Sequence, residues 1–212
     1  LGYPKSVQGT STLVMSDSCP SAQIVRYVFP ARDNMPKVAM PEVEVTWYDG
    51  GLRPQMPEGL PDECKFDDNG AIFYGSKDIL VCDGWGGNPR LASGRKPALT
   101  QNIRQVECSH QMDWVRACKE APEVRIPSKS DFSEAGPMNE MIVMAVLATR
   151  LQSLNQVLEW DGENMRFTNI PEGAKIKSCI KDGFTVKDGH PTFNKEWTPE
   201  VDANAFAAEL IK

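Results

Sequence analysis

This sequence has few histidines, no excess of basic over acidic residues and no long apolar run. Its 212 residues include 2 His, and 23 Lys+Arg stand against 29 Asp+Glu, so the formal net charge is −6. Phosphate binding needs clustered basic side chains, and this balance therefore argues against a nucleic-acid partner. The longest apolar run lies between Met141 and Ala148, whereas a membrane-spanning helix needs ~20 predominantly apolar residues. We expect neither a nucleic-acid nor a membrane partner.

The motifs of several enzyme classes are also lacking. There is no Walker-type phosphate loop, no G-x-S-x-G nucleophile motif and no H-E-x-x-H metal motif. The six cysteines are widely spaced without a C-x-x-C pair, and only His110 and His190 could join them as zinc ligands. We expect no metal site. Buried or free thiols are the favoured interpretation of the cysteines, and disulfides are the alternative.

The two ends of the chain suggest a piece of a longer protein. Leu1 takes the place of an initiator Met, and no basic or apolar region of an export signal follows it. The last residues, Glu209 to Lys212, stop inside an amphipathic segment. We expect that the chain was processed or cut, and its compartment stays unassigned.

The first part of the chain is typical of β-strands. Val43, Val45 and Trp47 alternate with polar residues, which predicts a strand with one wet face in an antiparallel sheet. Residues Gly75-Ser76-Lys77 predict the turn of a hairpin. The segments rich in β-branched and aromatic residues are 12–15, 22–29, 71–74 and 78–82.

Helical patterns appear only later. Ser109 predicts the cap of a helix that reaches about Glu120, with one apolar face made by Met112, Val115 and Cys118. Because the predicted strands come first and the predicted helices later, the sequence predicts an α+β fold. In this fold, helices pack on one face of an open, mainly antiparallel β-sheet. We expect a single domain over residues 1–212.

A second helix is predicted from Gly136-Pro137 to about Asn155, with proline in its first turn. Its residues 141–148 are apolar on all sides, which predicts burial on more than one side. Asp161-Gly162 predicts another hairpin. Beyond Pro171 we expect mostly loop and a terminal helix from about Val201.

Aromatic and charged side chains meet where the strand around residue 47 enters a long loop. Trp47, Tyr48, Asp49 and Arg53 combine aromatic faces with a carboxylate and a guanidinium, which suits a polyhydroxylated ligand. A core tryptophan beside a solvated turn explains the same residues equally well. Trp85 is a candidate of the same kind.

Two further features are candidate binding groups. His110 stands at the start of a predicted helix, where the positive helix end favours a ligand hydroxyl, although a locally bonded histidine is the favoured alternative. The segment Gly84 to Gly87 is the nearest match to a dinucleotide-binding loop. Asn88-Pro89 follows where the required helix would begin, so we expect a glycine-rich turn.

Several segments together resemble one enzyme family. They are Leu1-Gly2-Tyr3-Pro4, Phe29-Pro30-Ala31-Arg32, Thr46-Trp47-Tyr48-Asp49-Gly50-Gly51, Asn88-Pro89-Arg90-Leu91, Ser109-His110, Asp113-Trp114, Gly136-Pro137 and Leu158-Glu159-Trp160-Asp161-Gly162. In this order they resemble the carboxy-terminal domain of bacterial Gfo/Idh/MocA oxidoreductases, the glucose–fructose oxidoreductase and inositol dehydrogenase family. The resemblance covers about residues 1–171, and residues 176–212 depart from it.

The resemblance implies a two-domain parent enzyme. An amino-terminal Rossmann domain, absent from this chain, would bind NAD or NADP, and the present domain would line a pocket for a small sugar-like substrate. The family's glycine-rich loop, the lysine of its E-K-P motif and the histidine of its Asp/His motif are all outside this sequence. We therefore assign no catalytic and no cofactor-binding residue here, and expect the isolated chain to be inactive.

Three functions follow as hypotheses. The first is a substrate-binding and oligomerisation domain of an NAD(P)-dependent oxidoreductase acting on a sugar or polyol, with a homodimer or homotetramer formed through an exposed apolar sheet face. The second is the corresponding domain of an NAD-dependent glycosidase. The third is a non-catalytic carbohydrate-binding or assembly domain.

Overall fold

A computed structural model describes residues 2–14, 19–32, 41–64, 68–96, 104–176, 179–197 and 200–205. The chain divides into two compact units, Leu1–Arg53 with His110–Lys212, and Pro54–Ser109. The single domain over residues 1–212 stays a prediction. Among the described helices, none combines the length and the apolarity that crossing a membrane requires.

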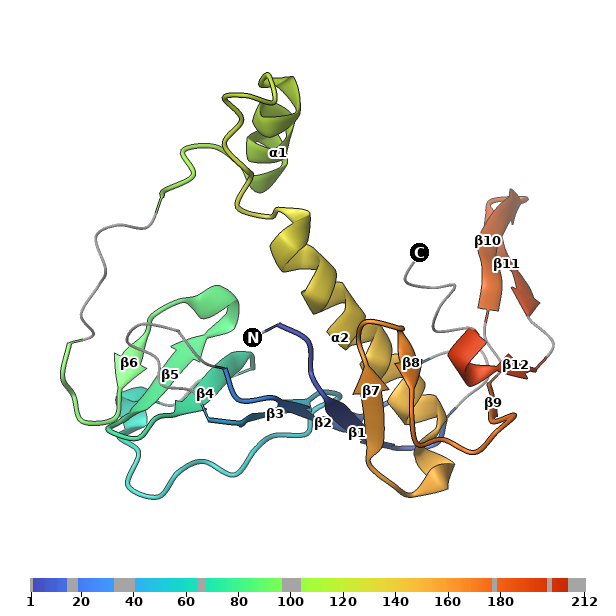
Figure 1. Cartoon of the computed structure of the whole chain (residues 1–212), viewed down its shortest axis with the longest axis horizontal. Helices are drawn as coiled ribbons and strands as arrows, with labels where there is room; N and C mark the ends of the chain where they lie inside the picture. The colour runs from blue at the N-terminus through green and yellow to red at the C-terminus, as the bar shows by residue number, and fades with distance from the viewer. Residues whose placement is uncertain are drawn as a thin grey trace. The chain divides into compact units, whose positions relative to one another are not determined.

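The larger unit is built on an antiparallel five-stranded sheet with the strand order β3-β2-β1-β7-β8 (Figure 1). Its strands are β1 (Ser6–Ser11), β2 (Gln23–Phe29), β3 (Val43–Tyr48), β7 (Leu158–Asp161) and β8 (Arg166–Phe167). With the antiparallel hairpins of the other regions, this confirms the predicted α+β class with an open, mainly antiparallel sheet.

The period of two along the strands separates a core face from a polar face. In β2, Val25, Tyr27 and Phe29 are buried, whereas Arg26 between them is exposed. On the uncovered face most side chains are polar: Gln8, Thr10, Arg26, Glu44 and Thr46 accompany Ile24, Val28 and Tyr48. The apolar uncovered face that motivated the oligomer prediction is therefore a mainly polar one.

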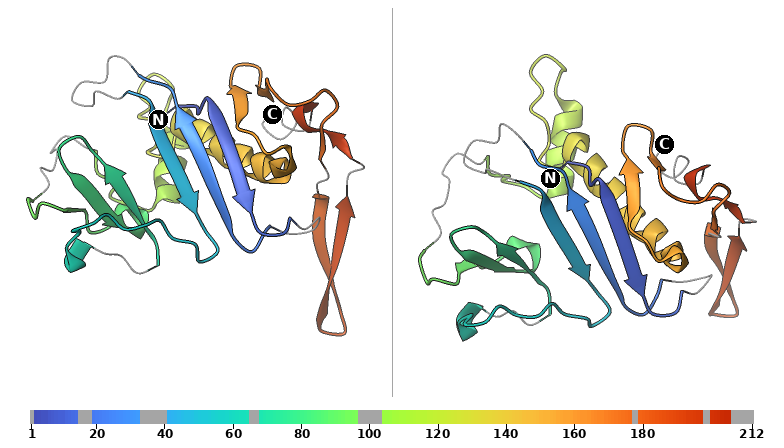
Figure 2. Two further views of the ribbon diagram at one scale, coloured as in Figure 1. Left: turned by 90° about the horizontal axis from the view of Figure 1, so that it is seen from below. Right: turned by 60° about the horizontal axis from the view of Figure 1, so that its bottom comes forward.

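The core face is covered by α2 (Phe132–Arg150), which lies across the sheet in both views of Figure 2. Met144, Leu147 and Ala148 enter the core that contains the buried residues of β1, β2 and β7. Gly9 permits this close approach, because a Cβ there would stand 2.7 Å from the backbone nitrogen of Thr149.

Two predictions about α2 are wrong. The helix begins earlier than Gly136-Pro137, because the Asp131 carboxylate caps it by accepting a hydrogen bond from the Ser133 amide at 3.0 Å. It is also buried mainly on the side that faces the sheet, and Met138, Ile142 and Val146 remain exposed. It ends at Arg150, and a 3-10 turn (Gln152–Leu154) follows.

Helix α1 (His110–Lys119) matches the predicted range but not the predicted face. Its buried residues are Asp113 and Ala117, whereas Met112 and Cys118 are exposed. Asp113 accepts hydrogen bonds from the Arg116 guanidinium at 3.1 Å and from the Lys129 amide at 2.8 Å. A polar network to the following segment therefore orients α1, although the sequence pattern predicted an apolar face.

The smaller unit is a three-stranded antiparallel sheet, and its β4–β5 hairpin was predicted. The strands are β4 (Gly70–Tyr74), β5 (Ile79–Asp83) and β6 (Arg90–Leu91). Leu60, Cys64 and Val81 form its buried core.

The carboxy-terminal part contains strands where loop was expected. They are β9 (Lys175–Ile176), β10 (Cys179–Lys187), β11 (His190–Trp197) and β12 (Val201–Asp202). Asp188 and Gly189, both at positive φ, form the turn between β10 and β11. Of the terminal helix predicted from about Val201, Val201 itself lies in a strand, residues 203–205 are helical as predicted, and residues 206–212 lie outside the described residues. At the other end, β1 precedes the predicted strand 12–15, of which Met15 lies outside the described residues.

Candidate functional site

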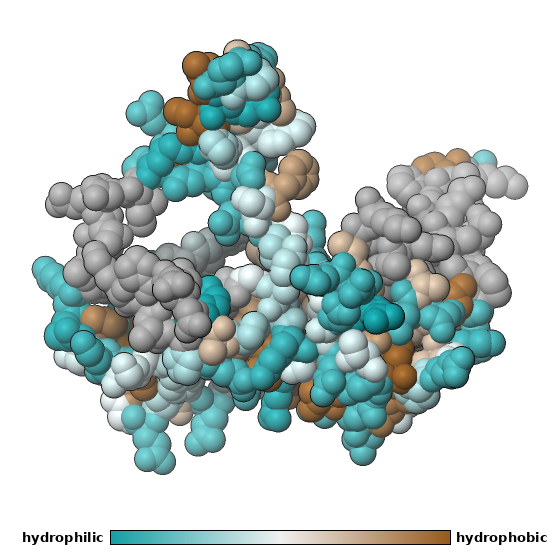
Figure 3. Space-filling view, in the orientation of Figure 1, coloured by the Kyte–Doolittle hydropathy of each residue, from teal (hydrophilic) through white to brown (hydrophobic). Residues whose placement is uncertain are grey.

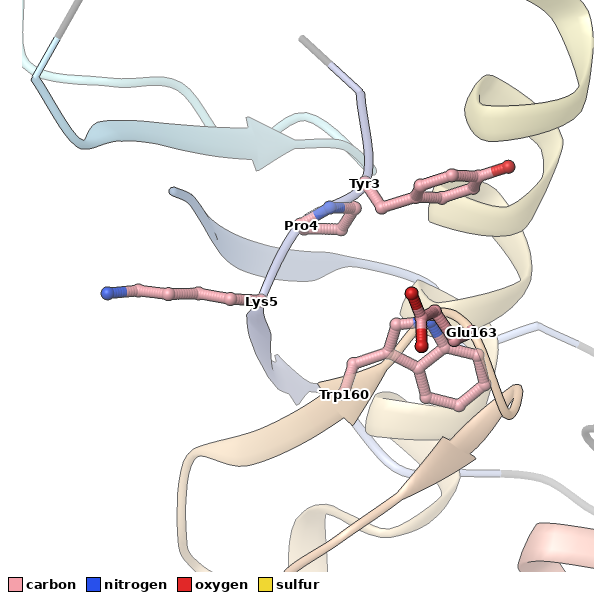
Figure 4. Close-up of a pocket in the computed structure, with 6 residues that line it drawn as sticks. Tyr3, Pro4, Lys5, Trp160 and Glu163 are labelled. Carbon is pink, nitrogen blue, oxygen red and sulfur yellow. The ribbon is translucent and has the colours of Figure 1, made fainter. Parts of the chain in front are cut away.

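Two distant parts of the chain meet in a pocket of about 430 Å³ in the larger unit (Figure 4). We name it the Tyr3–Trp160 pocket, and its lining residues are Tyr3, Pro4, Lys5, Trp160, Gly162 and Glu163. The segment before β1 supplies one wall and the β7–β8 hairpin supplies the other. In Figure 4 the Tyr3 ring and the Lys5 side chain extend away from each other, and the Trp160 indole lies below them.

Backbone pairing brings these walls together. The Trp160 amide donates to the Lys5 carbonyl at 2.9 Å, and the Lys5 amide donates to the Val28 carbonyl at 2.8 Å. Gly162 fits between the Tyr3 ring and α2, since a Cβ at this position would lie 3.5 Å from Tyr3 Cγ and 3.6 Å from Glu140 Oε1. The pocket is thus part of the sheet edge and of its turn.

A buried carboxyl group lies behind the pocket wall. Glu140 of α2 is only 3% exposed, and its Oε1 accepts a hydrogen bond from the Trp160 indole nitrogen at 2.5 Å. Burial raises the pKa of Glu140 above its ordinary value, although the hydrogen bond from Trp160 opposes this shift. Trp160 also packs edge-to-face on Phe167, with ring centroids 4.9 Å apart.

The pocket offers an aromatic surface with charges of both signs at its rim. Tyr3 and Glu163 are exposed, and the Lys5 ammonium forms an ion pair with the exposed Glu42 carboxylate. Tyrosine and carboxylate groups provide hydrogen bonds for hydroxyl groups, while the exposed Tyr3 ring provides a surface for C–H groups. The Trp160 ring below it is only 6% exposed. This chemistry suits a small, neutral, polyhydroxylated molecule.

Of the residues predicted from sequence, Trp47 and Asp49 are brought together. Asp49 Oδ2 accepts from the Trp47 indole nitrogen at 3.1 Å and from Gln23 Nε2 at 2.8 Å, and Asp49 Oδ1 accepts from the Gln23 amide at 3.1 Å. Gln23 in turn accepts from the Thr149 hydroxyl at 3.0 Å. The Asp49 carboxylate thus links β2, β3 and α2, while the Trp47 ring stays exposed.

The remaining predicted residues are dispersed. Tyr48 lies on the sheet face opposite Trp47, because neighbouring residues of a strand alternate. Arg53 is exposed in the segment after the Gly50-Gly51 turn, and His110 is the exposed first residue of α1. Trp85 belongs to the other compact unit.

Trp85 is held at the tip of a braced turn. It is fully exposed with a φ of 63°, and the 3-10 turn Gly84–Gly86 carries it between β5 and β6. Arg90 braces this turn by donating to Asp83 Oδ1 at 2.8 Å and to the Asn88 carbonyl at 2.7 Å. A dinucleotide loop would need a helix after β5, so this glycine-rich segment does not fit NAD or NADP.

None of the pocket residues was a site candidate from sequence, although Tyr3, Trp160 and Gly162 belong to segments that carry the resemblance. About 155 residues of sequence separate Tyr3 from Trp160 and Gly162, so no local pattern indicated that they are neighbours. Within the described ranges, no cluster of three or more His, Cys, Asp or Glu residues could hold a metal ion. Cys19, Cys64, Cys82, Cys108 and Cys118 are free thiols.

No protein-family model matches the chain, and no curated protein matches its sequence.

Proposed function

We propose that this chain is the substrate-binding and oligomerisation domain of an NAD(P)-dependent oxidoreductase that acts on a sugar or polyol. The cofactor and the groups that exchange hydride and proton with the substrate would belong to a Rossmann domain outside this chain. The chain by itself would bind the substrate class without converting it.

The observation that carries the proposal is the convergence of two segments in one pocket. Leu1-Gly2-Tyr3-Pro4 and Leu158-Glu159-Trp160-Asp161-Gly162 are two of the segments that resemble the enzyme family. Tyr3 and Pro4 of the first segment and Trp160 and Gly162 of the second line the Tyr3–Trp160 pocket. Segments far apart in the chain that supply one pocket favour a shared role in ligand binding.

The oligomer part of the proposal concerns the uncovered face of the five-stranded sheet. This face would pair with the same face of a second copy. Its polar side chains would make contacts around Ile24, Val28 and Tyr48. A twofold pairing of sheet faces is consistent with a dimer, and a second interface would be needed for a tetramer.

A non-catalytic carbohydrate-binding domain is the second candidate, favoured by Trp47 and Trp85. Both rings are exposed, and the indole nitrogen of Trp47 is occupied by Asp49, which leaves its ring face for stacking. Binding that depends on either tryptophan and not on Tyr3 would favour this second candidate.

Binding of a neutral polyol such as inositol tests the proposal. We expect equilibrium dialysis to detect binding by the wild-type chain, and Tyr3→Ala to weaken it about tenfold or more, because Tyr3 is an exposed wall of the pocket. Trp114→Ala, which removes an exposed aromatic ring of α1, is the matched control and should bind as the wild type does.

Calorimetry with NAD and NADP completes the test. We expect no binding, because the Gly84–Gly87 segment does not open a helix. Micromolar affinity for either nucleotide, or polyol binding unaffected by Tyr3→Ala, would overturn the proposal.

A further inference from the structure

The apolar side chains that α2 leaves in solvent form a regular row. Met138, Ile142 and Val146 follow one another at four-residue spacing, and they are 57%, 50% and 46% exposed. Residues four apart lie along one ridge of a helix. Figure 3 shows that hydrophobic and hydrophilic residues are interspersed on one face of the molecule.

The buried side of the same helix is apolar too. Met144, Leu147 and Ala148 of α2 lie in the core under the five-stranded sheet. A helix on the surface of a globular protein ordinarily has a polar side opposite its buried side. The exposed row is therefore not required by the packing of α2 on the sheet.

Charged residues of opposite sign continue the row at its two ends. Glu134 lies four residues before Met138, and Arg150 lies four residues after Val146. The row thus reads Glu, Met, Ile, Val, Arg, with Ile142 at its midpoint. When a second copy of the row runs in the opposite direction beside the first, each acidic end faces a basic end and each apolar residue faces an apolar residue.

We infer that this row is an interface with a second copy of the chain, in which two α2 helices pack antiparallel about Ile142. A twofold axis at Ile142 places Met138 against Val146 of the partner subunit, and Glu134 near Arg150 of the partner subunit. Interdigitation of four-residue ridges is the commonest mode of helix packing in globular proteins. The self-complementary order favours a second copy over an unrelated protein, because one sequence supplies both sides.

This surface is distinct from the uncovered sheet face of the proposed function. Two twofold interfaces whose axes intersect at right angles generate a tetramer, whereas either interface alone generates a dimer. The inference does not depend on the substrate or on the Tyr3–Trp160 pocket.

The row offers few side chains on each copy, so the interface should be smaller than the ~1,200 Å² of a stable specific complex. We expect a weak self-association that depends on concentration. Sedimentation equilibrium between about 10 μM and about 1 mM covers the affinities that such an interface supports.

Ile142→Glu places two carboxylates at the twofold axis, and we expect it to weaken self-association at least tenfold. Leu13→Glu, an exposed apolar residue outside the row, is the matched control and should leave association unchanged. Circular dichroism should give the same helix content for both variants, because both side chains are exposed. Met138→Glu provides a second test of the same row.

Charge reversal tests the antiparallel direction. Glu134→Arg alone should weaken association several-fold, and the double change Glu134→Arg with Arg150→Glu should restore it, because the ends of the row then pair again with exchanged charges. Failure of the double variant to recover would contradict the antiparallel pairing.

Two results would overturn the inference as a whole. One is a strict monomer over the entire concentration range. The other is association that Ile142→Glu leaves unchanged but Ile24→Glu, on the uncovered sheet face, abolishes; the sheet-face proposal would then stand and the α2 row would fail.

Discussion

Glu140 and Trp160 show how a single buried pair connects the core to the candidate pocket. The carboxyl group of Glu140 loses hydration inside the fold, and its partner is the indole N–H of Trp160 at 2.5 Å. Burial raises the pKa of Glu140 above the ordinary value of 4.5. The native state therefore holds this proton more tightly than the unfolded state does.

A pH-dependent stability follows from this raised pKa. The stabilisation that Glu140 contributes when protonated is fully present below pH 4.5 and is lost as the pH rises through the folded-state pKa. Glu140→Gln keeps an oxygen that can accept from Trp160 and carries no titratable proton. We expect urea unfolding to show that the free energy of unfolding of the wild type falls as the pH rises through this window. Glu140→Gln should lack this part of the fall.

Glu163→Gln is the control for the Glu140 experiment, because Glu163 is an exposed carboxylate of the same pocket. It should retain the wild-type pH dependence. An identical pH dependence of Glu140→Gln and the wild type would show that Glu140 does not titrate as its burial implies.

Asp49 stays a candidate ligand contact, and its carboxylate accepts three hydrogen bonds from the protein itself. Removing them with Asp49→Ala should lower the free energy of unfolding by about 2 kcal/mol, since the Gln23 and Trp47 donors lose their acceptor. Urea denaturation followed by tryptophan fluorescence measures this loss. Glu58→Ala, an exposed carboxylate of the loop that follows, should change stability little; an equal effect of both substitutions would remove the special role of Asp49.

At the scale of elements, the contact of β1 with α2 depends on Gly9 having no side chain. A Cβ on Gly9 would stand 2.7 Å from Thr149 N and 2.9 Å from Ala148 C, both backbone atoms of the helix. Gly9→Ala should therefore force α2 from the sheet and destabilise the fold by about 1–3 kcal/mol.

Gly136 provides the matched contrast to Gly9. It lies within α2, and a Cβ there would meet nothing within 4 Å. Gly136→Ala should stabilise the protein by about 0.5–1 kcal/mol, because alanine loses less backbone entropy in a helix. Thermal unfolding of both variants checks the pair, and a Gly9→Ala variant as stable as Gly136→Ala would contradict the described packing of α2 on β1.

Local signals predicted those elements whose residues show a clear period or turn. The alternation in β3 and the turns at Gly75 and Asp161-Gly162 identified strands and hairpins of the fold. The Asp188-Gly189 pair carries the same kind of turn signal between β10 and β11, in a region where loop was predicted.

Other features were out of reach of local patterns. Strand β1 contains Ser6, Gln8 and Gly9, which do not resemble a buried strand, yet Gly9 is needed for the approach of α2. The neighbouring residues 12–15 look more strand-like, but Leu13 is exposed beyond the end of β1. Tertiary contact decided the position of this strand.

For the whole molecule, the structure confirms the predicted class of fold, whereas the predicted site residues stay a prediction. The predicted aromatic and charged residues include one hydrogen-bonded pair, Trp47 with Asp49, whereas Trp85 belongs to the other compact unit. The pocket combines the first residues of the chain with Trp160 and Gly162. Pairing of β1 with β7 creates this neighbourhood, and single-sequence patterns do not reveal which strands pair.

The most direct test of the account is a map of backbone amide chemical shifts while a neutral polyol, and separately NAD, is added to the full chain. The account predicts that the polyol shifts the amides of Tyr3, Lys5, Trp160, Gly162 and Glu163, which surround the pocket, and that NAD shifts none of the described residues. Polyol shifts confined to other parts of the chain, or NAD shifts centred on Gly84 to Gly87, would contradict it.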